Sequence, residues 1–173
     1  MKNSNNNKKV AIIMGSASDL NIAEKCMEVL KGLGLEFEIN IISAHRTPEN
    51  ARDFALKARE NNFGVIIAIA GKAAHLAGVL AAHTRVPVIG VPVKSSDLGG
   101  LDALLSTVQM PSGVPVACVA IDGGANAAWL AARILALNDE ALADKLESEA
   151  FSMAENIEAK NHEIREKYNQ SAI

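Results

Sequence analysis

Short apolar runs alternate along the chain with segments in which apolar residues recur every three or four positions. The runs are rich in valine and isoleucine, and their hydrophobicity is continuous, which is typical of strands covered on both faces. They occupy residues 10–14, 37–42, 65–70, 86–93 and 114–121. The periodic segments predict helices over residues 19–33, 47–58, 73–84, 101–108 and 125–137.

A strand followed by a helix, repeated five times, predicts an α/β fold. We expect a doubly wound parallel sheet of five strands in a three-layer α/β/α arrangement, with right-handed crossovers. Periodicity does not fix the strand order, but a flavodoxin-like order is the natural expectation for this number of strands. The 173 residues are assigned to a single domain, with a disordered tail at 1–9 and the flavodoxin-like core at 10–137.

Residues 139–168 predict one extra, C-terminal helix. Its apolar residues form a stripe along one side, consisting of Leu142, Leu146, Ala150, Met153 and Ile157. Because no sixth strand remains for this helix to cover, we expect it to pack on a neighbouring subunit or across the domain. The alanine-rich helix at 125–136 is a second candidate for contacts between subunits.

Composition and charge narrow the class of protein. Hydrophobic residues make up 49% of the chain and aromatic residues only 3%, so the core is predicted to be aliphatic. A net charge of −3 gives no reason to expect nucleic acid or an anionic membrane as a partner, and the apolar runs are too short to span a bilayer. Residues 1–9 hold no apolar signal core, and Cys26 and Cys118 form no CxxC pair. The cytoplasm is therefore the expected location.

Candidate chemistry comes directly after the first strand. Ligands of such a sheet bind beyond the carboxyl ends of the strands, where Gly15, Ser16, Ser18 and Asp19 stand. Glycine allows a tight turn, the hydroxyls can bond a ligand, and Asp19 suits a ribose hydroxyl. Simple capping of the next helix by Ser18 and Asp19 is an equally good interpretation of the spacing. GxGxxG and Walker A motifs are absent from the sequence, so a dinucleotide or a nucleoside triphosphate is poorly supported.

Polar residues also come after the second strand, where Ser43, His45 and Arg46 precede a helix opened by Thr47 as a capping hydroxyl and Pro48. Arg46 can bind a phosphate or carboxylate through paired hydrogen bonds, and His45 can move a proton near neutral pH. Taken alone, a surface loop whose polar residues cap the helix is the simpler interpretation.

The third strand leads into a small-residue loop with two possible ligand-binding groups, Lys72 and His75. The loop comprises Ala70, Gly71, Lys72, Ala73, His75 and Leu76. Judged alone, a helix start with a satisfied histidine is slightly preferable. Three successive strand ends with such residues favour instead a site for a small phosphorylated or carboxylated ligand. The histidines are not spaced as metal ligands, so no metal is expected.

At these residues the chain resembles the bacterial N5-carboxyaminoimidazole ribonucleotide mutase family. The resemblance covers nearly all of residues 10–137. Its most specific motifs are MGSASD at 14–19, SAHRTP at 43–48, AAHL at 73–76, PVIGVPV at 87–93 and LLSTVQMP at 104–111. It implies a flavodoxin-like subunit, usually a homo-octamer. The implied reaction moves a carboxylate from an exocyclic amine to a ring carbon of an aminoimidazole ribonucleotide, without metal, cofactor or nucleoside triphosphate.

The resemblance also implies residue roles. Ser16, Ser18 and Asp19 match positions that hold ribose and phosphate, and Ser43 and Arg46 match further substrate contacts, with Arg46 on the phosphate. His45 matches the general acid and base. The loop from Ala70 to Leu76 matches the pocket around the migrating carboxylate.

The sequence departs from this family at a few positions. Lys72 stands where the family often has glycine, Ala77 where it often has proline, and the loop at residues 122–126 looks shorter than usual. Two alternatives remain open on this scaffold. One is a carboxylase that uses free carbon dioxide, and the other is a silent module that binds a mononucleotide.

Overall fold

The computed structural model describes residues 8–169, in which strands and helices alternate along the chain. The strands are β1 (Lys9–Met14), β2 (Phe37–Ile41), β3 (Phe63–Gly71), β4 (Val88–Val93) and β5 (Ala117–Cys118). The helices are α1 (Leu20–Leu33), α2 (Pro48–Lys57), α3 (Leu76–His83), α4 (Leu101–Val108), α5 (Gly124–Ala136) and α6 (Glu140–Tyr168), and a 3-10 helix, η1 (Ala17–Asp19), precedes α1.

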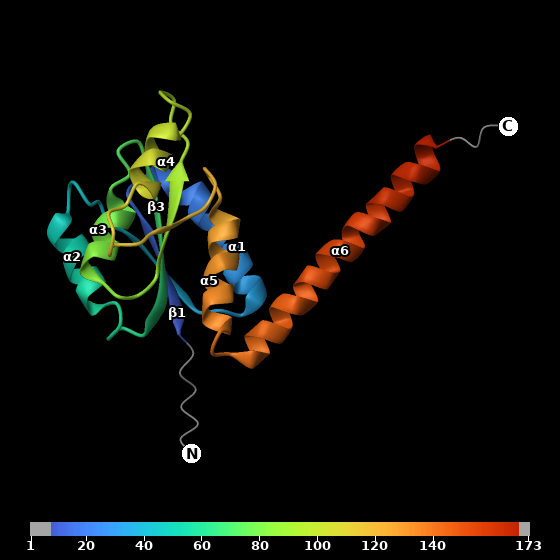
Figure 1. The fold of residues 1–173 in the computed structure, drawn as a ribbon, viewed down its shortest axis with the longest axis horizontal. Coiled ribbons are helices and arrows are strands. Elements are labelled where there is room, and N and C mark those ends of the chain that lie inside the picture. The colour runs from blue at the N-terminus through green and yellow to red at the C-terminus, as the bar shows by residue number, and fades with distance from the viewer. Residues whose placement is uncertain (1–7, 170–173) are drawn as a thin grey trace, which may run out of the picture.

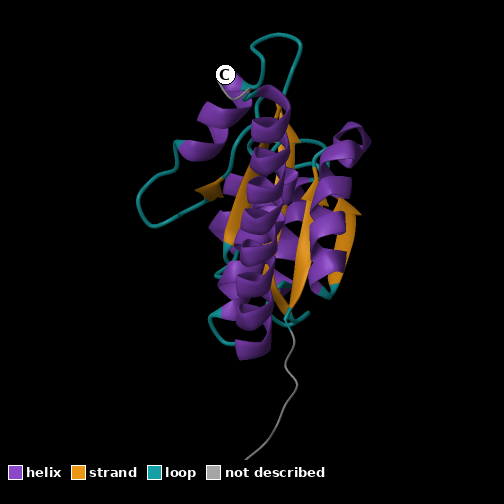
Figure 2. Cartoon of the chain, turned by 90° about the vertical axis from the view of Figure 1, so that its right-hand side faces the viewer, coloured by secondary structure: helices purple, strands orange, loops and turns teal. Residues whose placement is uncertain are grey.

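The strands form one parallel sheet in the order β2-β1-β3-β4-β5. This is the flavodoxin-like order, and helices cover both faces of the sheet, so the predicted three-layer fold is confirmed (Figures 1 and 2). The first crossover moves outward to β2 and the next returns past β1 to β3. The strands that follow β1 are therefore added first on one side of it and then on the other. The loops after β1 and β3 lead to opposite faces of the sheet at this point.

Two apolar cores lie on opposite faces of the sheet because alternate strand residues point to opposite sides. Val10 and Ile12 of β1 contact the core under α1 and α5, whereas Ala11 and Ile13 contact the core under α2 and α3. Helix α4 lies close to β4 at Gly90. A Cβ atom there would come within 2.3 Å of Cγ2 of Thr107, so glycine permits this approach.

The outer strands differ from the prediction. β5 has only two residues instead of the predicted eight at 114–121, and Pro115, which has no N–H to donate, stands inside the missing part. The prediction that β2 is covered on both faces is wrong, because Ile39 and Ile41 are 37% and 56% exposed. The reason is that β2 lies at the edge of the sheet, and the helices pack mainly on the other strands.

Several element starts also shift. β1 begins at Lys9, inside the tail predicted as disordered, and the remainder of that prediction for residues 1–7 lies outside the described residues. α3 begins at Leu76 rather than at 73, because the N–H groups of Ala74 and His75 donate to the carbonyls two residues earlier, each at 2.8 Å, and not in the helical pattern. Thr47 does not cap α2 with its side chain; its hydroxyl instead accepts from the Ser43 N–H and donates to the Ser43 carbonyl, both at 3.0 Å.

The two helices expected at subunit contacts behave differently. Ala127, Ala128, Ala131 and Ala132 of α5 are fully buried within the subunit, so this face of α5 packs on the subunit's own core. Subunit contacts by the other residues of α5 stay a prediction. Helix α6 contacts the body through its first turns only and then projects away from it (Figure 1). Leu142 is the buried member of its predicted stripe. Helix α6 therefore does not pack across the domain, as one of the two expectations had it.

Candidate active site

The turn after β1 is organised around Asp19. The Ser16 N–H donates to Oδ2 of Asp19 at 3.1 Å, the Ser18 N–H donates to Oγ of Ser16 at 3.4 Å, and Oγ of Ser18 donates to Oδ1 of Asp19 at 3.3 Å. These contacts form a capping box at the start of η1 with Ser16 as the capping residue, whereas Asp19 makes no side-chain capping bond to α1. Burial raises the pKa of Asp19, which is only 5% exposed, and the hydrogen bonds from Ser16 and Ser18 oppose this rise.

The loop after β2 is tied back to the loop after β1 through Arg46. The guanidinium of Arg46 donates to the Gly15 carbonyl at 3.3 Å and to Oγ of Ser43 at 3.4 Å. The backbone N–H of Arg46 donates to the same Ser43 hydroxyl at 3.2 Å. Arg46 remains exposed. The Ser43 hydroxyl and the Gly15 carbonyl that its guanidinium contacts are neutral, so they do not neutralise its positive charge. An arginine in this state can bind an incoming phosphate or carboxylate.

Two histidines from different loops meet at this edge of the sheet. Nε2 of His45 lies 2.8 Å from Nδ1 of His75, with the rings edge to face and their centroids 4.9 Å apart. A hydrogen bond at this distance requires that one of the two nitrogens carries a proton and the other does not. One ring proton therefore bridges the loop after β2 and the loop after β3.

The β3 loop approaches β4 closely at Gly71, where a Cβ atom would lie 3.4 Å from the Val93 side chain. The next residue, Lys72, adopts the left-handed backbone conformation with φ of 55°. Its ammonium lies 3.1 Å from Oδ2 of Asp97. The sequence alone does not reveal this pairing, because Asp97 lies in the loop after β4, which was not among the candidate segments.

All of the predicted site residues line one cavity of about 600 Å³ at the carboxyl ends of the strands. From the loop after β1 they are Ser16, Ser18 and Asp19; from the loop after β2, Ser43, His45 and Arg46; and from the loop after β3, Ala70, Gly71, Lys72, Ala73, His75 and Leu76. The fold thus brings together residues separated by up to 60 positions in the sequence. Their individual roles toward a ligand stay predictions.

The structure adds Val93, Lys94 and Ser95 to the wall of this cavity. They end β4 and begin the loop after it. Lys94 and Ser95 could have been found by the rule that located the other residues, because they too stand directly after a predicted parallel strand. Lys94 adds a second cation to Arg46 in the cavity wall, which suits an anionic ligand.

A second hollow, of about 1110 Å³, lies at the opposite, amino end of the sheet beside the start of α6. It holds none of the predicted site residues, and it mixes cations such as Arg59 and Lys145 with Glu36 and Glu140. Ligands of parallel sheets bind at the carboxyl ends of the strands, so the smaller cavity is the candidate active site. Within residues 8–169, no cluster of three or more His, Cys, Asp or Glu side chains is placed to hold a metal ion. No helix in this part of the chain is long and apolar enough to cross a membrane.

Residues 9–156 match the model of the family described as AIR carboxylase. The chain is 52% identical over 157 residues to the N5-carboxyaminoimidazole ribonucleotide mutase of Pyrococcus horikoshii, an alignment that covers 91% of this chain and 89% of that protein. It is also 48% identical over 155 residues to the phosphoribosylaminoimidazole carboxylase of Saccharomyces cerevisiae, covering 90% of this chain but 27% of that longer protein.

A solved structure shares the fold. The crystal structure of Treponema denticola PurE superimposes with a TM-score of 0.81 at 36% sequence identity. The match covers 94% of this chain and 99% of that chain.

Proposed function

The chain belongs to the AIR carboxylase family and is an enzyme; from this premise, we propose that it catalyses the mutase reaction of purine biosynthesis. The substrate would be N5-carboxyaminoimidazole ribonucleotide and the product 4-carboxy-5-aminoimidazole ribonucleotide. The observation that carries the proposal is the contact between His45 and His75 in a cavity whose other walls hold Arg46 and Asp19. A proton donor, an anion-binding cation and a hydroxyl acceptor are thereby within one small volume.

Binding would use the two loops that Arg46 joins. The guanidinium of Arg46 would hold the substrate phosphate, helped by the hydroxyls of Ser16 and Ser43, and the carboxylate of Asp19 would accept from a ribose hydroxyl. Asp19 already accepts from Ser16 and Ser18, so its oxygens are fixed in orientation before substrate arrives. Such fixed acceptors favour one ribose orientation and lower the entropy lost on binding.

The chemistry needs one proton to be given and one to be taken. In the first step the bond between the exocyclic nitrogen and the carboxylate carbon breaks, its electron pair stays on nitrogen as carbon dioxide leaves, and His45 supplies a proton to that nitrogen. In the second step the ring carbon forms a bond to carbon dioxide and its proton passes to His45. The net proton count on His45 is unchanged at the end of the cycle.

His75 would act on His45 rather than on substrate in this scheme. Because Nε2 of His45 takes part in the contact with Nδ1 of His75, that contact holds the His45 ring in orientation and must break before this nitrogen gives a proton to substrate or takes one from it. Small residues of the β3 loop, Ala70, Gly71 and Ala73, leave room beside this pair for carbon dioxide.

The second candidate is a carboxylase that acts on the uncarboxylated ribonucleotide, and the similarity to the yeast carboxylase favours testing it. The measurement is turnover of purified protein with the carbamate ribonucleotide in bicarbonate-free buffer, against the uncarboxylated ribonucleotide with bicarbonate. We expect conversion of the carbamate alone, with no requirement for ATP or added metal. Sustained product from the second mixture only would favour the carboxylase, and no turnover in either would indicate a binding module.

We propose further that the enzyme is a cytoplasmic homo-octamer. Apolar residues on the outer face of α4 and along α6 support an assembly of subunits, because they are exposed in the isolated chain. They are Leu98, Leu101, Leu105 and Val108 at α4 and Phe151, Met153 and Ile157 on α6. Light scattering at micromolar concentration measures the mass, and a monomer would contradict the proposal.

A further inference from the structure

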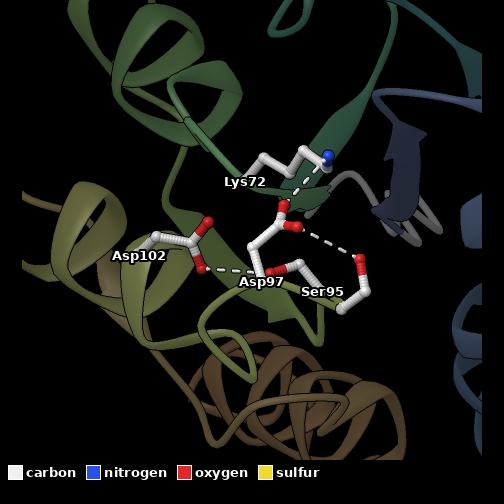
Figure 3. Close-up of polar contacts among 5 residues, drawn as sticks. Lys72, Ser95, Asp97 and Asp102 are labelled. Atoms are coloured by element: carbon white, nitrogen blue, oxygen red, sulfur yellow. Dashed lines mark hydrogen bonds and ion pairs between the residues drawn. The ribbon is translucent and has the colours of Figure 1, made fainter.

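Acidic side chains connect the three loops after β3, β4 and β5. Lys72 in the first loop pairs with Asp97 in the second, and the N–H of Lys94 in the second donates to Oδ1 of Asp122 in the third at 2.9 Å. Within the second loop, Oγ of Ser95 donates to Oδ1 of Asp102 at 3.4 Å (Figure 3). The loop after β4 is thereby tied on both sides.

The Lys72–Asp97 pair connects two walls of the candidate active site. Lys72 belongs to the wall formed after β3, and Asp97 stands two residues beyond Ser95, the last residue of the opposite wall. Beyond Asp97 the loop ends in Gly99 and Gly100, both at positive φ, so it turns sharply into α4. Among these three polar contacts, the one between Lys72 and Asp97 is the direct tie between the β3 and β4 loops.

The contact with Lys72 stabilises the charged form of the Asp97 carboxyl. The hydrogen bond and charge of Lys72 lower the pKa of Asp97, with a smaller contribution from the Ser96 hydroxyl. The side chains are 71% and 62% exposed, so the pair is a solvent-facing contact of modest strength. Because Lys72 is engaged in this way, its ammonium is directed to Asp97 rather than standing as a free cation in solvent.

We propose that Lys72 and Asp97 are positioning residues that hold the β4 loop against the β3 loop and so retain the carbon dioxide formed during the reaction. This inference rests on the proposed mutase function. Carbon dioxide is uncharged, so no ion pair can bind it, and only enclosure keeps it beside the ring. A molecule that escapes leaves the uncarboxylated ribonucleotide, which forms product only after a carbon dioxide from solution replaces the one lost.

Escape is measurable as isotope exchange. The carbamate ribonucleotide is converted in buffer that contains ¹³C-bicarbonate and carbonic anhydrase, and the labelled fraction of the product is measured early in the reaction, with a control lacking enzyme. The wild-type enzyme should incorporate little label. Asp97→Asn, which preserves shape and removes the charge, should raise the labelled fraction about two- to fivefold, the scale of an exposed ion pair.

Two matched variants test whether a change in labelling comes from loss of the Lys72–Asp97 ion pair itself. Asp53→Asn removes one partner of a similarly exposed ion pair, Arg52–Asp53 on α2, and should leave the labelled fraction unchanged. The double variant Lys72→Asp with Asp97→Lys reverses the pair at the same total length, and Asp tolerates the left-handed conformation at position 72, so exchange should return toward wild type.

Lys72→Gly provides the decisive comparison. If the pair is a tie, this variant leaks as Asp97→Asn does, while its thermal stability is unchanged or higher because glycine accepts a φ of 55° without strain. If Lys72 instead attracts bicarbonate, Asp97→Asn frees its charge and raises labelling, whereas Lys72→Gly lowers it. Opposite responses, or no response in either variant, overturn the inference. Absence of wild-type turnover would instead refute the proposed function.

Discussion

The carboxyl edge of the sheet and helix α6 both leave many side chains exposed, but those side chains are of opposite chemistry. At the sheet edge the exposed groups are polar and bond one another, as His45 does to His75 and Arg46 to Ser43. On α6 the exposed groups include Phe151 and Ile157, each 65% exposed, and they contact nothing in the described part of the subunit that would bury them. Exposed polar groups held in fixed contact indicate chemistry within one chain, whereas exposed apolar groups indicate a surface completed by another chain.

The two regions also differ in how they are held in place. The edge is positioned by β1 and β3, whose pairing lies at the centre of the sheet, so its geometry results from the folding of a single subunit. Helix α6 is fixed only near Leu142 and Leu146, and its remaining turns depend on their intrinsic propensity unless a partner covers them. Variants in the two regions should therefore fail in different ways.

The largest effect is expected from His45→Asn. Asparagine retains a polar group of similar size but cannot exchange a proton near neutral pH, so kcat should fall by about a hundredfold or more. Thermal unfolding and subunit number should stay as in the wild type, because His45 is exposed and contributes to no core. Steady-state kinetics, calorimetry and light scattering measure the three quantities. Near-normal kcat would remove His45 from the mechanism.

Arg46→Ala should raise KM rather than lower kcat. The lost contact is a charge-assisted one to the phosphate, and we expect an increase in KM of about ten- to hundredfold. Arg52→Ala is the control, because Arg52 is an exposed arginine on α2 whose partner is Asp53. Titration calorimetry with the ribonucleotide measures binding directly, and unchanged affinity in Arg46→Ala would mean that the phosphate binds elsewhere.

On α6, Phe151→Asp combined with Ile157→Asp should lower the assembled mass while leaving the subunit folded. A charge placed on an apolar contact surface must be desolvated when a partner docks, which disfavours assembly. Glu155→Ala, on the same exposed helix, is the control and should leave the mass unchanged. Light scattering and circular dichroism separate loss of assembly from loss of the helix. An unchanged mass in the double variant would show that Phe151 and Ile157 do not lie in a subunit interface.

The smallest effect is expected from Asp19→Asn, which should weaken ribonucleotide binding and slightly raise the stability of the fold. Burial raises the pKa of Asp19, so its charged form is less stable in the fold than in the unfolded chain. Asparagine keeps an acceptor for the Ser16 N–H without the charge, and the melting temperature at pH 7 should rise by on the order of 1–2 °C.

The raised pKa also sets how this effect varies with pH. The stability difference between Asp19→Asn and the wild type is fully present above the folded-state pKa. It shrinks as pH falls toward the ordinary aspartate value of about 3.9, because the wild-type carboxyl is then protonated. Ribonucleotide affinity should decrease at pH 7. A lower melting temperature at pH 7 would show that the capping contact of the carboxylate outweighs its burial.

The sequence by itself determined the elements and the residues around the cavity. Continuous Val and Ile runs indicate buried parallel strands, and parallel strands place their carboxyl ends at one edge, so residues 16–19, 43–46 and 70–76 had to converge there. The sequence did not predict that the strand expected at 114–121 would shrink to two residues, because its length depends on how β5 pairs with β4 at the edge of the sheet.

Only the tertiary structure decided which of these residues touch. The contact of His45 with His75, the bond from Arg46 to the Gly15 carbonyl and the pair of Lys72 with Asp97 all join loops that are distant in sequence. The direction in which α6 projects from the body is likewise a feature that only the tertiary structure shows (Figure 1). Periodicity reports which face of an element is buried, and that is a local property of the chain. A side-chain contact between two loops depends on the relative position of the strands that carry them to within an ångström, and packing of the whole domain sets that position.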